Sequence, residues 1–311
     1  MEQSFLIIIL SAAVTAGTPL LFAALGELLT QKAGIMNLGL EGMMLCGAAA
    51  GFVITVRTGS LFWGVLFAMV AGGLLALLHA FLSISLKANQ VVSGLALAIF
   101  GTGLSSFIGK SMIGIPAPVS FKKIKIPLLN EIPFLGQVLF NYDALVYLSF
   151  FLVAGVWFLI YKTKFGLTLR AVGENPGAAD SLGVNVFLIR YLYVTIGGML
   201  AGLGGAYLSL AFAPSWLENM TAGRGWIALA LVIFSTWNPV RALLGAYIFG
   251  GIDALVYRMQ AFSVVIIPSF FLKMMPYIFT VLVLIFATRE TSRKRIGAPG
   301  ALGLAYEREA R

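Results

Sequence analysis

The sequence predicts an all-α polytopic membrane protein, on the evidence of its composition and its long apolar segments. Of its 311 residues, 60% are hydrophobic and 11% are charged, and the mean hydropathy is +0.97. A soluble domain carries about 25% charged residues, so this chain cannot cover a water-exposed surface. The composition excludes an ordinary soluble enzyme, a nucleic-acid-binding protein and a disordered chain. With one cysteine, Cys46, and one histidine, His79, the chain cannot build a disulfide framework or a cysteine or histidine metal site, and no cofactor is expected.

Nine apolar segments account for most of the chain and are the predicted membrane spans. A helix needs about 20 residues to cross the ~30 Å hydrocarbon core. Residues 1–311 are therefore expected to form a single transmembrane domain. The predicted spans are approximately residues 5–27, 35–56, 62–86, 91–109, 142–161, 190–213, 225–238, 241–260 and 267–287.

The basic residues favour an N-terminus outside and a C-terminus inside. In that orientation thirteen lysines and arginines lie on the inner side of the membrane and eight on the outer side, as the positive-inside rule requires. Six of the thirteen lie in a basic tail, residues 288–311. The lysines of the 110–141 loop oppose the trend, because they lie outside in this orientation.

The inner loop of residues 161–190 is the most polar internal stretch and contains the signals of a short helix. Asn175 is a suitable N-cap, Pro176 suits the first helical position and Gly183 suits the position after the last turn. A helix of about two turns is only marginally stable alone. It needs a surface to dock on, which indicates a partner on the inner side.

Small-residue motifs recur in the same order in the two halves of the chain. Ala33-Gly34 opens the second span and Ala222-Gly223 opens the seventh. Gly72-Gly73-x-x-Ala76-Leu77 in the third span matches Gly250-Gly251-x-x-Ala254-Leu255 in the eighth. This order predicts an inverted repeat of spans 1–4 and 6–9, an architecture in which transporters place a binding site between the repeats. The alternative is that membrane helices share small residues by composition alone.

Polar side chains within the spans are candidates for a solute pathway, because burying them in a membrane costs free energy. Asn37 and Glu41 are four residues apart in the second span and are expected on one helix face. Asp253 lies near the middle of the eighth span. The alternative for all three is a structural role, as hydrogen-bonded groups that lock neighbouring helices together.

The seventh span is unusually short and follows a glycine-rich motif. Only 12 residues run from Trp226 to Trp237, about 18 Å of helix. The preceding Gly223-Arg224-Gly225 suits a broken helix whose first amides point into a cavity and hold polar substrate atoms. Trp226 could stack on a nucleobase or a sugar, or it could anchor the helix at the membrane interface.

Three segments resemble one transporter family. They are residues 32–43 (KAGIMNLGLEGM), residues 171–179 (AVGENPGAA) and residues 223–230 (GRGWIALA). Together they are similar to permease subunits of ABC importers in the branched-chain amino acid/ribose permease superfamily. The chain most resembles the smaller of the paired permeases in bacterial nucleoside or simple-sugar importers.

The resemblance implies a set of partners and a location. The subunit would lie in the bacterial inner membrane and form a heterodimer with a second permease. An ATP-binding cassette ATPase would bind inside, and a lipid-anchored substrate-binding protein would bind outside. Membrane lipid and a small polar solute are the other expected contacts, and no nucleic acid is. Nucleosides are the first substrate class that the resemblance suggests, and simple sugars such as ribose are the second.

The resemblance also makes the 161–190 loop the coupling loop that docks on the ATPase. Importer coupling loops often carry Glu-Ala-Ala-x-x-x-Gly, and here Gly177 stands where the glutamate would be. The residues expected to couple the permease to the ATPase are Glu174, Asn175, Pro176, Ala178, Ala179, Asp180 and Gly183.

ATP binding by the chain itself is not expected. Gly109-Lys110-Ser111 ends like a P-loop, but five residues instead of four separate Gly103 from Gly109. The subunit is therefore predicted to be a transport component and not an enzyme. Two other classes stay open: an ion-coupled secondary transporter that uses Glu41, His79 and Asp253 as a relay, and a structural membrane scaffold.

Overall fold

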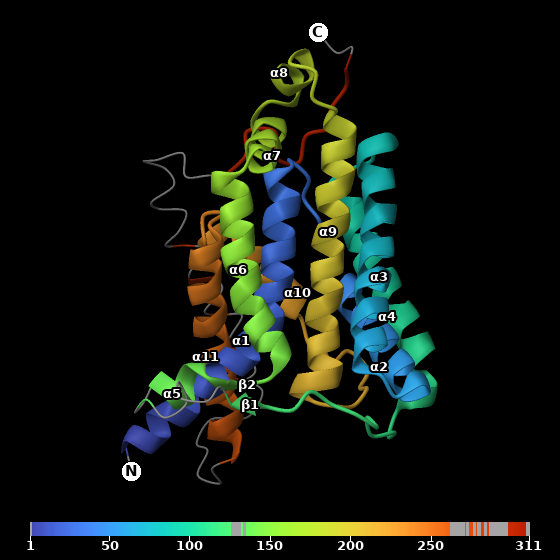
Figure 1. Cartoon of the computed structure of the whole chain (residues 1–311). Coiled ribbons are helices and arrows are strands. Elements are labelled where there is room, and N and C mark those ends of the chain that lie inside the picture. The colour runs from blue at the N-terminus through green and yellow to red at the C-terminus, as the bar shows by residue number, and fades with distance from the viewer. Residues whose placement is uncertain are drawn as a thin grey trace.

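The structure, a computed structural model, is a bundle of long helices that run between its two ends (Figure 1). It describes residues 2–125, 132, 135–261, 271, 274, 275, 278, 281, 282, 285 and 298–308. The ninth predicted span, residues 267–287, therefore lies largely outside the described residues, as do residues 288–297 of the basic tail.

Within the described residues, seven helices are long and apolar enough to cross a membrane. They are α1 (Glu2–Lys32), α2 (Leu40–Thr58), α3 (Leu61–Ala80) with the π-helical turn η1 (Phe81–Ser85), α4 (Gln90–Gly109) with the 3₁₀ turn η2 (Lys110–Met112), α6 (Ala144–Lys162), α9 (Val186–Tyr207) with the π-helical turn η4 (Leu208–Phe212), and α11 (Pro239–Ala261). Each coincides with one of the nine predicted spans.

The seventh span has the short length that the sequence predicts, whereas the second span differs from its prediction. The seventh forms α10 (Arg224–Phe234), whose 11 residues make about 16 Å of helix, half of the ~30 Å hydrocarbon core. The second span begins later than predicted, because residues 35–39 form a turn and α2 starts at Leu40. Hydrophobicity does not separate a helix from a buried turn whose backbone groups find partners within the protein.

Side-chain caps fix the start of three long helices. Asn89 Oδ1 accepts hydrogen bonds from the amides of Val91 and Val92 at the start of α4. Asp143 caps α6 in the same way, and Asn185 caps α9. These contacts satisfy amides that have no partner inside the helix. The starts of these helices are therefore encoded by local sequence.

The central helix is α9, which packs against α1, α2 and α3 (Figure 1). Glycines bring these helices close together. A Cβ on Gly202 would lie 2.2 Å from the carbonyl oxygen of Ala68 in α3, and one on Gly47 of α2 would lie 2.5 Å from Gly202 itself. A Cβ on Gly26 of α1 would lie 2.3 Å from the carbonyl oxygen of Gly197. Such crossings give membrane helices the van der Waals contact that drives their association.

The two ends of the bundle carry different connections (Figure 1). A two-stranded sheet and a short helix lie at the end where α1 starts, which we call the β end. Two helices project at the opposite end, the α8 end, beside residues 298–308. At the β end, β1 (Ile124–Lys125) pairs antiparallel with β2 (Asn141–Tyr142), and the short helix is α5 (Leu135–Leu139). At the α8 end, the two helices are α7 (Lys164–Glu174) and α8 (Pro176–Ser181).

Candidate functional site

Glu41, in the first turn of α2, binds the start of α10 with its carboxylate. Oε1 accepts hydrogen bonds from the Thr221 hydroxyl at 2.5 Å and from the Gly223 amide at 2.8 Å. Oε2 accepts from the Gly225 amide at 2.7 Å. The start of a helix has unpaired amides and a partial positive charge. The buried carboxylate is therefore stabilised there by charge-assisted hydrogen bonds.

This contact requires glycine at two positions. Gly223 has a φ of +81°, in the left-handed region that favours glycine. A Cβ on Gly225 would lie 2.5 Å from the Glu41 amide nitrogen, which is closer than any side chain permits. The Gly223-Arg224-Gly225 motif is thus explained by the approach of Glu41.

Arg224, between these glycines, forms an ion pair with Asp253 of α11. Its Nη2 donates to Asp253 Oδ2 at 3.1 Å, and the two side chains are 7% and 17% exposed. Its Nη1 donates to the carbonyl oxygen of Thr221 at 3.1 Å. Removing one member of such a buried pair leaves the other charge uncompensated. We call Glu41, Thr221, Arg224 and Asp253 the α10 clasp, because together they hold the start of α10 between α2 and α11.

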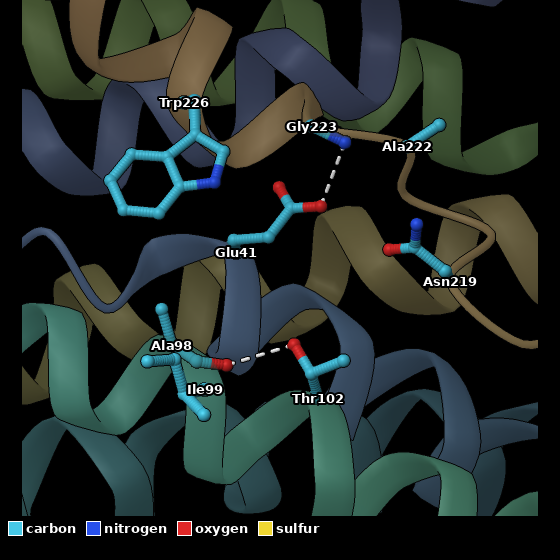
Figure 2. Close-up of a pocket in the computed structure, with 8 residues that line it drawn as sticks. All are labelled: Glu41, Ala98, Ile99, Thr102, Asn219, Ala222, Gly223 and Trp226. Atoms are coloured by element: carbon cyan, nitrogen blue, oxygen red, sulfur yellow. Dashed lines mark hydrogen bonds between the residues drawn. The ribbon is translucent and has the colours of Figure 1, made fainter.

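A pocket of about 500 Å³ opens beside the clasp. Small-molecule sites have volumes of roughly 300–1,000 Å³. Figure 2 shows the Glu41 side chain between the Trp226 indole and the Asn219 amide. An aromatic face beside polar groups suits a flat solute that carries hydrogen-bonding groups. The lining residues are Glu41, Ala98, Ile99, Thr102, Asn219, Ala222, Gly223 and Trp226.

The short helix predicted in the 161–190 loop is present as α8. Asn175 Oδ1 accepts a hydrogen bond from the Ala178 amide at 3.0 Å, and Pro176 is the first helical residue. Gly183 follows the helix with a φ of +82°. The predicted signals therefore act as expected, although the loop also contains α7, which the sequence reasoning did not separate.

Two faces of α8 have different environments. Ala179 is 2% exposed and packs with Val172 of α7 and Val186 of α9. Ala178 is exposed, and Leu182, directly after α8, is 84% exposed. An apolar side chain at the tip of a polar projection is suited to anchor a partner. The outward surface is therefore formed by Ala178 and Leu182, while Ala179 supports the helix from beneath.

Glu174 and Asp180, two of the predicted coupling residues, bind the chain's own C-terminal segment. Glu174 Oε2 accepts a hydrogen bond from the Gly300 amide at 3.1 Å. Asp180 Oδ2 accepts from Arg308 Nε at 3.0 Å. In this structure both carboxylates make contacts within the subunit.

A family model for the branched-chain amino acid transport system / permease component matches residues 9–290. The match spans most of the chain. The chain belongs to this permease family. With seven membrane-length apolar helices among its described residues, the permease is a multi-pass protein of the bacterial inner membrane.

Relatives of this permease are named for two kinds of solute. It is 43% identical to the putative glucose ABC transporter permease protein TsgC13 of Haloferax volcanii, over 99% of both chains. It is 37% identical to the nucleoside ABC transporter permease protein NupC of Lactococcus lactis, over 89% of this chain and 91% of the relative. It is also 37% identical to the guanosine ABC transporter permease protein NupQ of Bacillus subtilis, over 94% and 96%. All three relatives are thus named as permease subunits of ABC transporters, which are transport components.

Asn37 of the permease does not share a helix face with Glu41, contrary to prediction. It lies in the turn before α2, where its Oδ1 accepts a hydrogen bond from the Gly39 amide at 2.9 Å. Its backbone N–H donates to Glu27 Oε1 of α1 at 3.1 Å. Glu41 and Trp226 line one pocket, and Asp253 belongs to the α10 clasp through its ion pair with Arg224. Asn37 instead lies in the turn that leads into α2.

Two other ionisable groups within the spans of the permease, His79 and Glu27, have separate partners. His79 contacts the Ser93 hydroxyl through Nδ1 and the Met36 carbonyl oxygen through Nε2, both at 3.1 Å. Glu27 accepts a hydrogen bond from Gln31 Nε2 at 2.8 Å. His79 is thus a hydrogen-bonded bundle histidine, and its partners differ from those of Glu41 and Asp253.

The sequence reasoning assigned no contact or role to three residues of the permease that matter at these sites. Thr221 and Arg224 complete the clasp, and Leu182 forms the tip beyond α8. Leu182 had a usable signal, since it is a large apolar residue inside the most polar loop. The partnership of Thr221 with Glu41 had none, because 180 residues separate them.

Proposed function

We propose that this permease is the smaller of two permease subunits in an ATP-driven nucleoside importer. It forms half of the translocation pathway and works by alternating access, in which the pathway opens to one side of the membrane at a time. The pocket beside the clasp carries this proposal, and two relatives that are named for nucleosides support it. The nucleobase stacks on Trp226, and Asn219 and Thr102 offer hydrogen bonds to its polar edge or to the ribose.

An importer of a simple sugar is the second candidate. The relative with 43% identity is named for glucose, and an aromatic ring with hydrogen-bonding neighbours also suits a sugar face. The two proposals share the same pocket and differ in its occupant.

The proposed orientation places the β end outside the cell and the α8 end inside. The start of α1 and residues 298–308 lie at opposite ends of the bundle (Figure 1), as an odd number of crossings requires. Nine spans satisfy this, with α10 as the shortened seventh and residues 267–287 as the ninth. Spans 1–4 and 6–9 form the inverted repeat in this proposal, and α10 is the broken helix near their interface.

The proposed partners bind at the two ends. An ATP-binding cassette ATPase docks on Ala178 and Leu182 at the α8 end, and a lipid-anchored substrate-binding protein docks at the β end. A second, different permease pairs with this one to complete the pathway. Movement of α8 during the ATPase cycle tilts the helices, which changes access to the pocket.

Uptake of labelled guanosine, ribose and glucose tests the proposal. Cells carry the complete transporter with either an active or a hydrolysis-dead ATPase. Guanosine uptake that requires the active ATPase supports the nucleoside importer, and uptake of ribose or glucose on the same condition supports the sugar importer. Uptake that survives the dead ATPase would contradict both and would support an ion-coupled carrier.

A further inference from the structure

Residues 298–308, which we call the strap, cross the α8 end of the bundle and bind two separate parts of the chain through their backbone. The Ala301 amide donates to the Gly173 carbonyl oxygen in α7 at 2.9 Å. The Gly303 amide donates to the Gly34 carbonyl oxygen, in the turn between α1 and α2, at 3.1 Å. The strap therefore bridges α7 to the turn that leads into α2.

Arg190 of α9 holds the strap at a third point. Its side chain is 1% exposed, and Nη1 donates to the carbonyl oxygen of Leu304 at 3.3 Å. Among the ion pairs formed by described residues, none involves Arg190. A buried cation without a carboxylate partner depends on the acceptors that it has. The Leu304 carbonyl is one such acceptor, so the strap and the buried guanidinium stabilise each other.

Tyr306 extends the strap beneath α8. Its ring centre lies 5.9 Å from that of Phe187 in α9. It also packs against the small cluster of Val172, Ala179 and Val186, which holds α8 on α7 and α9. The strap thus completes the apolar support of the helix that presents Ala178 and Leu182 outward.

Two exposed ion pairs flank these contacts. Lys87, beyond α3, pairs with Glu307 at 2.6 Å, and Arg308 pairs with Asp180 at 3.0 Å. Exposed pairs of this kind contribute little free energy. The backbone bonds, Arg190 and Tyr306 therefore carry the attachment.

We propose that the strap couples α8 to the α10 clasp, so that α7, α8 and the α1–α2 turn move as one body when the ATPase displaces α8. This inference rests on the proposed function and specifies how the docking signal reaches the pocket. Gly34, which the strap binds, lies seven residues before Glu41, and the intervening turn leads directly into α2. Close-packed elements shift between discrete arrangements and do not deform continuously. A displacement of α8 is therefore passed through the strap to the start of α2 and so to the clasp.

The first test compares the complete transporter with one in which this subunit ends at residue 297, both in proteoliposomes. ATP hydrolysis and solute uptake are measured together, with whichever of guanosine, ribose and glucose the full-length transporter imports. We expect the shortened subunit to retain the ATPase through Ala178 and Leu182, and the ATP hydrolysed per solute to rise about threefold or more. An assembled complex with an unchanged ratio would overturn the proposal.

A matched pair of point variants decides the question if the shortened subunit does not assemble. Tyr306→Ala removes the ring that supports α8, and we expect it to raise the ATP hydrolysed per solute. Leu304→Ala removes an exposed side chain and keeps the carbonyl that Arg190 binds, so we expect no change. An equal amount of ATP hydrolysed per solute by these two variants, in assembled complexes, would overturn the proposal.

A cross-linking test asks whether the strap stays attached during the cycle. Asp180→Cys and Arg308→Cys in a Cys46→Ala background are joined by a bifunctional thiol reagent. We expect coupled uptake to continue, because the strap and α8 move together. A loss of uptake on cross-linking would mean that the strap must detach, which contradicts the proposal. Full-length uptake that persists with a hydrolysis-dead ATPase would instead overturn the proposed function itself, and the strap's role with it.

Discussion

Glu41 and Glu27 are both buried carboxylates, yet their hydrogen bonds differ in number. Glu41 accepts three hydrogen bonds that use both oxygens. Glu27 accepts two on Oε1, from Gln31 and Asn37, and its Oε2 has no partner among the described residues. The donors around Glu41 therefore need a hydrogen-bond acceptor at both oxygen positions, whereas those around Glu27 need one at Oε1 only.

Replacing each glutamate with glutamine tests this difference. In Glu41→Gln the new amide group faces a donor whichever way it turns, so one buried donor loses its acceptor at a cost of about 1–3 kcal/mol. Glu27→Gln can place its amide at the position of the unpartnered oxygen. We expect Glu41→Gln to lower uptake per subunit in the membrane and the Tm of the purified transporter, and Glu27→Gln to change neither. Equal losses for both variants would refute the assignment.

Trp226 is the residue whose role in the pocket is easiest to isolate. Stacking of a base on an aromatic side chain contributes about 1–3 kcal/mol, so Trp226→Ala should raise the half-saturating guanosine concentration about five- to 140-fold. Trp63→Ala on α3 serves as the control, because Trp63 is also partly exposed but does not line the pocket. Concentration-dependent uptake measures both. A similar response of the two variants would remove Trp226 from the pathway.

At the scale of elements, α8 shows which features of a helix local sequence signals predict and which they do not. Asn175, Pro176 and Gly183 predicted its limits because capping acts over two or three residues. They did not predict which face is buried. Ala179 faces inward only because α7 and α9 happen to converge beneath it.

The two faces of α8 predict different outcomes for the same substitution. Leu182→Arg adds a charge to the exposed tip, so we expect weaker retention of the ATPase with an unchanged Tm of the isolated subunit. Ala179→Arg forces a charged side chain into the support of α8, so we expect the Tm to fall as well. Co-purification of the ATPase and thermal unfolding distinguish the two effects. Normal ATPase retention by a well-folded Leu182→Arg variant would place the docking surface elsewhere.

At the scale of the whole molecule, the seven long helices of the described part of the chain and the short α10 follow the predicted spans closely. This agreement has a physical cause: a membrane helix must satisfy its backbone internally over a fixed apolar length. The turn at residues 35–39 is the departure, and α10 has the short length that its sequence predicted. Both lie at the clasp, where contacts from distant segments replace the hydrogen bonds of a continuous helix.

The proposed orientation can be tested with a membrane-impermeant thiol reagent on intact cells. Cys46 is buried, so a single new cysteine dominates labelling. Thr58→Cys, at the end of α2, should react from outside, and Leu182→Cys should react only after the membrane is opened. The reverse pattern would invert the topology and would place α8 outside, where no ATPase could reach it.

The sequence by itself determined the membrane class, most span limits, the capped helix α8 and the family resemblance. These depend on apolar length and on interactions between near neighbours, which the order of residues states directly. Only the tertiary structure decided that Glu41 binds the start of α10, that Arg224 pairs with Asp253 and that Arg190 binds the strap. These partners are 29 to 184 residues apart. A polar residue in an apolar span signals that a partner must exist, because its burial is costly. Which partner meets that need depends on how the helices pack.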